Sequence, residues 1–174
     1  MISAMFCQAA LAQDIPTFTG KGSVTQAINT DTGAILDIEG ATMLFPKGLP
    51  VGRSRLVTLK KATKKVAAAQ VQKGFAPLGV ALDFSTPLSA GGGKPIEVAV
   101  AVKNDPRKGG TKLVLAMEVG TLCNDQNKSA KLKGGLCSGW EFVDAEYDGA
   151  GRRLVAKLQS TGGLRMQFGL LPEG

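Results

Sequence analysis

Apolar residues recur along the chain in short runs, and in many of these runs they alternate with polar residues. A period of two is typical of β-strands that bury one face, and turns rich in glycine, proline and aspartate separate the runs. The nine runs that we interpret as strands are residues 34–38, 42–45, 55–59, 80–84, 96–102, 112–119, 141–147, 153–158 and 164–170. Strands at this spacing are typical of a sandwich or a barrel. We expect an all-β protein, a single β-sandwich of antiparallel strands.

Two segments between the runs add to this picture. Residues 160–163, Ser-Thr-Gly-Gly, separate the last two runs and predict a hairpin with a short glycine turn. Residues 62–73 contain three consecutive alanines flanked by lysines, which favour a helix. Val66 and Val71 in the same segment suit a strand as well. This is the one segment for which the sequence permits a helix.

The first twelve residues have features of an export signal. They are uncharged and largely apolar, and Ala10 and Ala12 are the small residues that signal peptidase requires. The basic start of a usual signal is missing, because no Lys or Arg precedes Lys21, and a flexible N-terminus is the alternative. We expect a signal peptide over residues 1–12, one domain over 13–174, and a periplasmic or extracellular location. No run approaches the roughly 18 apolar residues of a membrane helix, so we expect no transmembrane segment.

The cysteines fit an oxidising compartment. Cys7 would leave with the signal, and Cys123 and Cys137 remain as a pair. We expect a disulfide between them that closes the loop 124–136 and contributes about 3 kcal/mol in the chain-entropy model. Two free buried thiols are the alternative. Because the chain has no histidine, two cysteines cannot complete the usual tetrahedral zinc site without carboxylates or a second chain. We expect no metal and no cofactor.

The net charge of +7 is concentrated in one segment. No acidic residue lies between Glu39 and Asp83, whereas eight Lys and Arg residues do. A positive field of this kind attracts acidic polysaccharide or phospholipid head groups. Nucleic acid is a weaker candidate, because the stretch has no Tyr or Trp for base stacking. A solvated, lysine-rich face that protects sheet edges is the alternative. The residues of the candidate anion-binding site are Arg53, Arg55, Lys60, Lys61, Lys64, Lys65 and Lys73.

The search for catalytic residues is mostly negative. Without histidine the chain can form neither a Ser-His-Asp triad nor a Cys-His pair. Alternation in the run around residues 140–148 places Asp144, Glu146 and Asp148 on one strand face, where paired carboxylates could hydrolyse glycosides or bind calcium. A solvated strand face is the favoured interpretation. We expect no catalytic residues, and we expect the lone tryptophan, Trp140, to lie in the core beside the disulfide.

Two blocks of sequence resemble the ZU-five β-sandwich domain of zonula occludens proteins, netrin receptors, ankyrins and exported bacterial proteins. Residues 40–52, Gly-Ala-Thr-Met-Leu-Phe-Pro-Lys-Gly-Leu-Pro-Val-Gly, are similar to the family's run from a glycine through an apolar strand to Pro-x-Gly-x-x-Pro. Residues 79–87, continuing to Lys-Pro-Ile-Glu-Val at 94–98, look like its later segment. The resemblance implies an interaction or structural module without catalytic residues.

We therefore expect a non-catalytic exported module for protein interaction or structural assembly at the cell envelope or surface. Its partner would be an envelope or surface protein or a second copy of the chain. The alternative is an anion-binding module that uses the basic stretch 53–73. A glycosidase that uses Asp144 and Glu146 is the weakest hypothesis.

Overall fold

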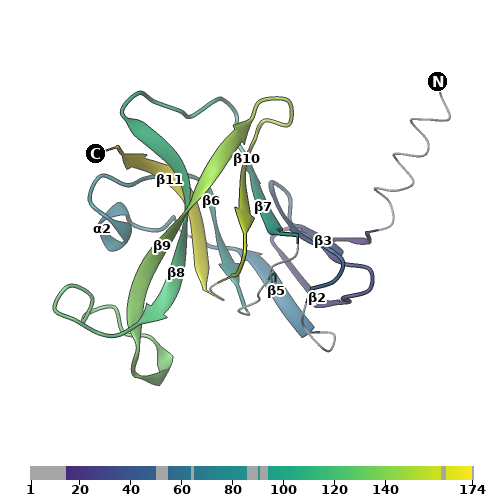
Figure 1. Cartoon of the computed structure of the whole chain (residues 1–174), viewed down its shortest axis with the longest axis horizontal. Helices are drawn as coiled ribbons and strands as arrows, with labels where there is room; N and C mark the ends of the chain where they lie inside the picture. Colours follow the sequence, from purple (N-terminus) through teal and green to yellow (C-terminus); the bar gives the residue numbers. More distant parts are fainter. Residues whose placement is uncertain are drawn as a thin grey trace.

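The computed structural model of the chain describes residues 15–49, 55–63, 65–85, 90, 94–161 and 164–173 (Figure 1). The predicted signal peptide, residues 1–12, lies outside these residues. All nine predicted runs form strands, so the all-β prediction is confirmed. Two further strands, β1 (Thr17–Thr19) and β2 (Ser23–Ile28), precede them. The pattern did not reveal these two, because their apolar residues are too few to form a run.

The remaining elements follow the predicted runs closely, with most differences at the strand ends. The strands are β3 (Ala34–Asp37), β4 (Ala41–Phe45), β5 (Arg55–Lys61), β6 (Ala76–Phe84), β7 (Ile96–Ala101), β8 (Thr111–Thr121), β9 (Cys137–Asp148), β10 (Arg153–Leu158) and β11 (Arg165–Pro172). The segment that could be helical contains only one helical turn, α2 (Ala68–Val71), and a 3₁₀ turn, η1 (Lys133–Gly135), precedes β9.

The strands form one nearly closed, barrel-like sheet, so the prediction of a two-sheet sandwich is wrong. The strand order is β1-β3-β4-β7-β10-β9-β8-β11-β6-β5-β2. The long strand β9 keeps the sheet continuous, because residues 137–144 pair with β8 and residues 145–148 pair with β10. The two edge strands, β1 and β2, are consecutive in the chain and joined by residues 20–22 alone. This short connection brings the two edges of the sheet together. The pairing of β1 with β3 is parallel, an exception to the antiparallel prediction.

The predicted hairpin between the last two strands is also wrong. Strand β10 lies between β7 and β9, whereas β11 lies between β8 and β6, so the two strands do not pair. A glycine turn permits a hairpin, but both edges of β10 are already occupied by other strands. The connection therefore carries the chain from one side of the sheet to the other.

Two apolar clusters lie on opposite faces of the sheet. The main core fills the interior, with fully buried side chains such as Phe45, Leu115 and Phe168. The second cluster lies on the outer face of β8 and β11 and consists of Phe75, Val114, Ala116 and Leu171, with Val71, Trp140 and Phe142 packed against it. Residues 65–75, which precede β6 and include α2, cover this outer face (Figure 1).

The buried side chain of Gln167 attaches this covering segment to the sheet. Its Oε1 accepts a hydrogen bond from the backbone N–H of Val66 at 3.4 Å, and its Nε2 donates to the carbonyl of Leu78 at 2.8 Å. The pairing of β11 with β6 is irregular at this point, because the register shifts between Met166 and Phe168. Gln167 thus gives the carbonyl of Leu78 a hydrogen-bond donor where the pairing of β6 is irregular. Its hydrogen bond with Val66 also links the covering segment to β11.

The structure corrects the expectation for Trp140. Cys137 is fully buried, whereas Trp140 is only half-buried and belongs to the outer cluster. Residues three apart in a strand point to opposite faces, so the two side chains cannot both enter the main core.

Candidate binding site

The structure separates the described residues of the predicted basic site. Lys60 and Lys61 end β5, and as neighbours in a strand they point to opposite faces of the sheet. Lys65 and Lys73 lie in the covering segment on either side of α2, and both are exposed. Arg55 begins β5, while Arg53 and Lys64 lie outside the described residues.

A row of alternating charges crosses four neighbouring strands on the outer face. Glu118 of β8 contacts Arg165 of β11, Arg165 lies opposite Asp83 of β6, and Asp83 lies opposite Lys60 of β5. Directly opposed residues of opposite charge stabilise a sheet. Asp83 therefore places a negative charge opposite Lys60 in the strand register, which weakens the positive field of Lys60 toward an anionic ligand.

Glu118 is a buried charge in this row. Only 4% of the residue is exposed, and its neighbour Met117 points into the main core, so Glu118 points to the outer face. Its two carboxylate oxygens accept hydrogen bonds from Arg165 Nε at 2.9 Å and Nη2 at 2.8 Å. The hydroxyl of Ser138 is 2.5 Å from Oε2 and donates to it. Burial alone would raise the pKa of Glu118, but the hydrogen bonds from Arg165 and Ser138 outweigh it and hold the pKa below its ordinary value.

Arg165 is held on two sides. Its bidentate contact with Glu118 fixes the plane of the guanidinium, and the guanidinium carbon lies 5.6 Å from the centroid of the Trp140 ring. The hydrogen bonds to Glu118 raise the pKa of Arg165 above its ordinary value, although its partial burial opposes this shift. A cation in this setting stays charged at every physiological pH.

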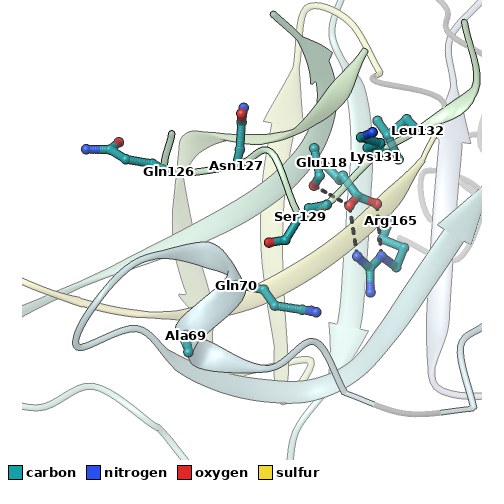
Figure 2. Close-up of a pocket in the computed structure, with 11 residues that line it drawn as sticks. Ala69, Gln70, Glu118, Gln126, Asn127, Ser129, Lys131, Leu132 and Arg165 are labelled. Atoms are coloured by element: carbon teal, nitrogen blue, oxygen red, sulfur yellow. Dashed lines mark hydrogen bonds and ion pairs between the residues drawn. The ribbon is translucent and has the colours of Figure 1, made fainter. Parts of the chain in front are cut away.

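A pocket of about 370 Å³ lies beside this ion pair. Figure 2 shows Glu118 and Arg165 between two walls. One wall is the helical turn α2, with Ala69 and Gln70, and the other is the loop between β8 and β9. The loop residues that line the pocket are Gln126, Asn127, Ser129, Ala130, Lys131 and Leu132, and Ser138 of β9 completes it. The lining is mainly amide, hydroxyl and charged groups.

The predicted disulfide is present and closes the loop that forms this wall. Cys123 and Cys137 are linked, with their Cα atoms 5.0 Å apart. Inside the loop, Asn124 and Asn127 cap one another: the N–H of Asn124 donates to Asn127 Oδ1 at 2.7 Å, and the N–H of Asn127 donates to Asn124 Oδ1 at 3.1 Å. The loop is thus held by a covalent link and by its own polar side chains, so this wall has a defined shape without a ligand.

The three carboxylates on β9 differ in their surroundings. Asp144 and Glu146 are exposed, and Asp148 accepts hydrogen bonds from Arg153 Nε at 3.0 Å and from the N–H of Gly151 at 3.2 Å. Asp148 therefore closes the turn between β9 and β10. Within the ranges that the structure describes, no three Asp, Glu or Cys side chains gather closely enough to hold a metal ion.

Sequence reasoning missed the two residues at the centre of this site. Each is the only charged residue of a mainly apolar run, Glu118 in Leu-Ala-Met-Glu-Val and Arg165 in Leu-Arg-Met-Gln-Phe. A single charge in a strand that is otherwise apolar is a usable signal, because buried charges are usually paired. The signal does not identify the partner, which lies 47 residues away in the chain.

A scan of the chain against protein-family models matched no family, and a search of curated proteins found no match. The resemblance to the ZU-five domain therefore stays a prediction.

Proposed function

We propose that the protein is an exported, non-catalytic binding module that contacts a partner protein at the cell envelope or surface. The contact is made by the pocket between the disulfide loop and α2. The observation that carries the proposal is the buried ion pair of Glu118 and Arg165 beside this preformed polar pocket.

The state of Glu118 favours binding over catalysis. A general acid must be protonated near the working pH, and a general base needs a free lone pair directed at its substrate. The lowered pKa of Glu118 keeps it ionised, and Arg165 and Ser138 occupy its oxygens. Glu118 thus supports the pocket by fixing Arg165, and it is unsuited to proton transfer.

Two observations support export. The disulfide requires an oxidising compartment to form and persist. Residues 1–12 have features of a signal peptide, without its basic start. Apart from the question of export, none of the helices in the described ranges is long and apolar enough to cross a membrane. The ZU-five resemblance of residues 38–102 agrees with an interaction module.

Site-specific cross-linking in cells tests the proposal. A photoreactive amino acid replaces Gln126, which is exposed at the pocket rim, and in a matched control it replaces Asp31, in the turn between β2 and β3. We expect one recurrent envelope protein, or a second copy of the chain, to be captured from position 126 and not from position 31. Equal capture from both positions, or no capture from position 126, would contradict the proposal.

Anion binding is the second candidate, and one observation outside the predicted stretch favours it. Lys47, Lys94 and Lys157 line a pocket of about 580 Å³, together with one carboxylate, Glu97, and apolar side chains such as Leu44, so the lining carries two excess positive charges. We propose retention on a sulfated polysaccharide matrix as the test. Neutralising Lys47, Lys94 and Lys157 with glutamine is compared with the same change at Lys60, Lys65 and Lys73. If neither triple variant loses retention, anion binding is rejected.

A further inference from the structure

The guanidinium of Arg165 has N–H donors that its contact with Glu118 does not use. A guanidinium carries five N–H donors. The Nε and Nη2 groups donate to Glu118, and within the part of the chain that the structure describes the Nη1 group has no hydrogen-bond partner. The side chain of Arg165 is 37% exposed and lines both the 370 Å³ pocket and a neighbouring pocket of about 290 Å³ beside β5 and β6. The unused donors are therefore accessible.

A second cation lies at the same pocket. Lys131 of the disulfide loop lines it, is exposed, and forms no ion pair with any described residue. The three charged residues of the pocket lining are Glu118, Arg165 and Lys131, so the lining carries one excess positive charge; Asp83, opposite Arg165 on β6, lies outside this lining. Lys128 of the same loop differs, because it pairs with Asp125 at 3.6 Å and does not line the pocket.

The rest of the lining suits a short peptide side chain with its backbone. Gln70 and Gln126 carry amides that can bond to peptide N–H and C=O groups, and Leu132 offers a small apolar contact for an aliphatic stem. Trp140, the residue best suited to stack on a sugar ring, is not part of the pocket lining, and Arg165 lies over its ring. One excess positive charge matches a monoanion such as a carboxylate better than a dianionic phosphate.

We propose that the pocket takes an aspartate or glutamate side chain from an acidic segment of the partner protein. The Nη1 edge of Arg165 and the ammonium group of Lys131 hold its carboxylate. This inference rests on the proposed function for its statement that the ligand belongs to a protein.

The test is a titration of the full chain with the blocked peptide Ac-Gly-Glu-Gly-NH₂, followed by NMR of the Arg165 side-chain Nε resonance. Ac-Gly-Gln-Gly-NH₂ is the uncharged control. We expect a saturable shift with the glutamate peptide alone, and an affinity about two- to fivefold lower in Lys131→Gln, as for a partly exposed ion pair. Lys128→Gln is the matched variant and should bind as the unchanged protein does. Both variants replace exposed side chains and leave the Glu118–Arg165 pair intact.

Several outcomes would overturn the inference. They are no saturable shift, equal binding of the two peptides, equal losses in the two variants, or tighter binding of glucuronate or inorganic phosphate than of the glutamate peptide. The last outcome would assign the pocket to a glycan or a phosphate group. Failure of the proposed function is distinguishable, because cross-linking at position 126 would then capture no protein although the glutamate peptide still binds. If capture succeeds and the peptide does not bind, only the carboxylate inference fails.

Discussion

The aromatic ring of Phe75 lies directly on the backbone of Gly169. A Cβ atom on Gly169 would overlap the Cε2 and Cζ atoms of this ring and would lie 2.7 Å from the carbonyl oxygen of Ala76. Only glycine therefore lets the covering segment approach β11 this closely. Phe75 is 2% exposed and is the centre of the outer apolar cluster, so this contact helps to place α2 at the pocket.

Gly169→Ala should consequently displace Phe75 and loosen the covering segment. We expect a loss of about 1–3 kcal/mol in the free energy of unfolding, as for overpacking in a core, measured by urea denaturation. Gly109→Ala is the control, because a Cβ at position 109 meets nothing within 4 Å. Its effect should stay within about 0.5 kcal/mol. Equal effects of the two substitutions would show that the Phe75 contact does not constrain the chain.

Removing Arg165 should cost more than removing the whole ion pair. Arg165→Met leaves the buried carboxylate of Glu118 without its cation, and we expect a loss of about 3 kcal/mol in unfolding free energy. The double variant Arg165→Met with Glu118→Leu removes the unpaired charge, and it should recover part of that loss. A double variant less stable than the single one would indicate that the pair itself contributes net stability.

The low pKa of Glu118 predicts a dependence of stability on pH. The folded pKa lies below the ordinary value of 4.5, so folding favours the charged form. The stabilisation is fully present above about pH 4.5 and is lost as the pH falls through the folded pKa. Glu118→Gln should have a smaller loss of unfolding free energy over this window. Denaturation at several pH values below 6 measures the difference, and parallel curves for the two proteins would contradict it.

Hydrogen bonds also lower the pKa values of two aspartates. Hydrogen bonds from Arg107 lower the pKa of Asp105, and a hydrogen bond from Arg153 lowers the pKa of Asp148. Asp105 is exposed in the connection between β7 and β8, and Asp148 ends β9. Neither shares a hydrogen bond with Glu118, so both keep their contacts in Glu118→Gln. The comparison between variant and unchanged protein therefore isolates the contribution of Glu118.

The row of charges predicts that Lys60, a candidate anion-binding residue, also stabilises the pairing of β5 with β6. Lys60→Glu places two negative charges opposite one another on β5 and β6, and we expect a loss of about 0.5 kcal/mol in unfolding free energy. Adding Asp83→Lys restores opposite charges across these two strands but places a lysine opposite Arg165, so recovery should be partial. No recovery would mean that the Lys60–Asp83 register contributes nothing. Charge reversal at Lys60 is therefore a poor test of anion binding, and neutral glutamine is the better substitution.

The alternation of apolar residues was sufficient to find nine of the eleven strands, because burying one strand face requires an apolar residue at every second position. The cysteine pair was found equally well, since the two cysteines that remain beyond the predicted signal peptide have one simple pairing. The pattern could not find β1 and β2, whose few apolar residues belong to short edge strands.

Only the tertiary structure decided which strands are neighbours. The sequence before β11 is compatible with a hairpin, yet β11 lies between β6 and β8 and does not pair with β10. Trp140 likewise lies on the outer face, whereas Cys137, three residues earlier in β9, is buried. The pocket depends on the same choice, because Glu118 and Arg165 meet only when β8 and β11 are adjacent. The sequence by itself determined nine of the eleven strands, because alternation is a local property of the chain. Strand order depends on contacts between distant residues across the whole sheet, and no local pattern encodes them.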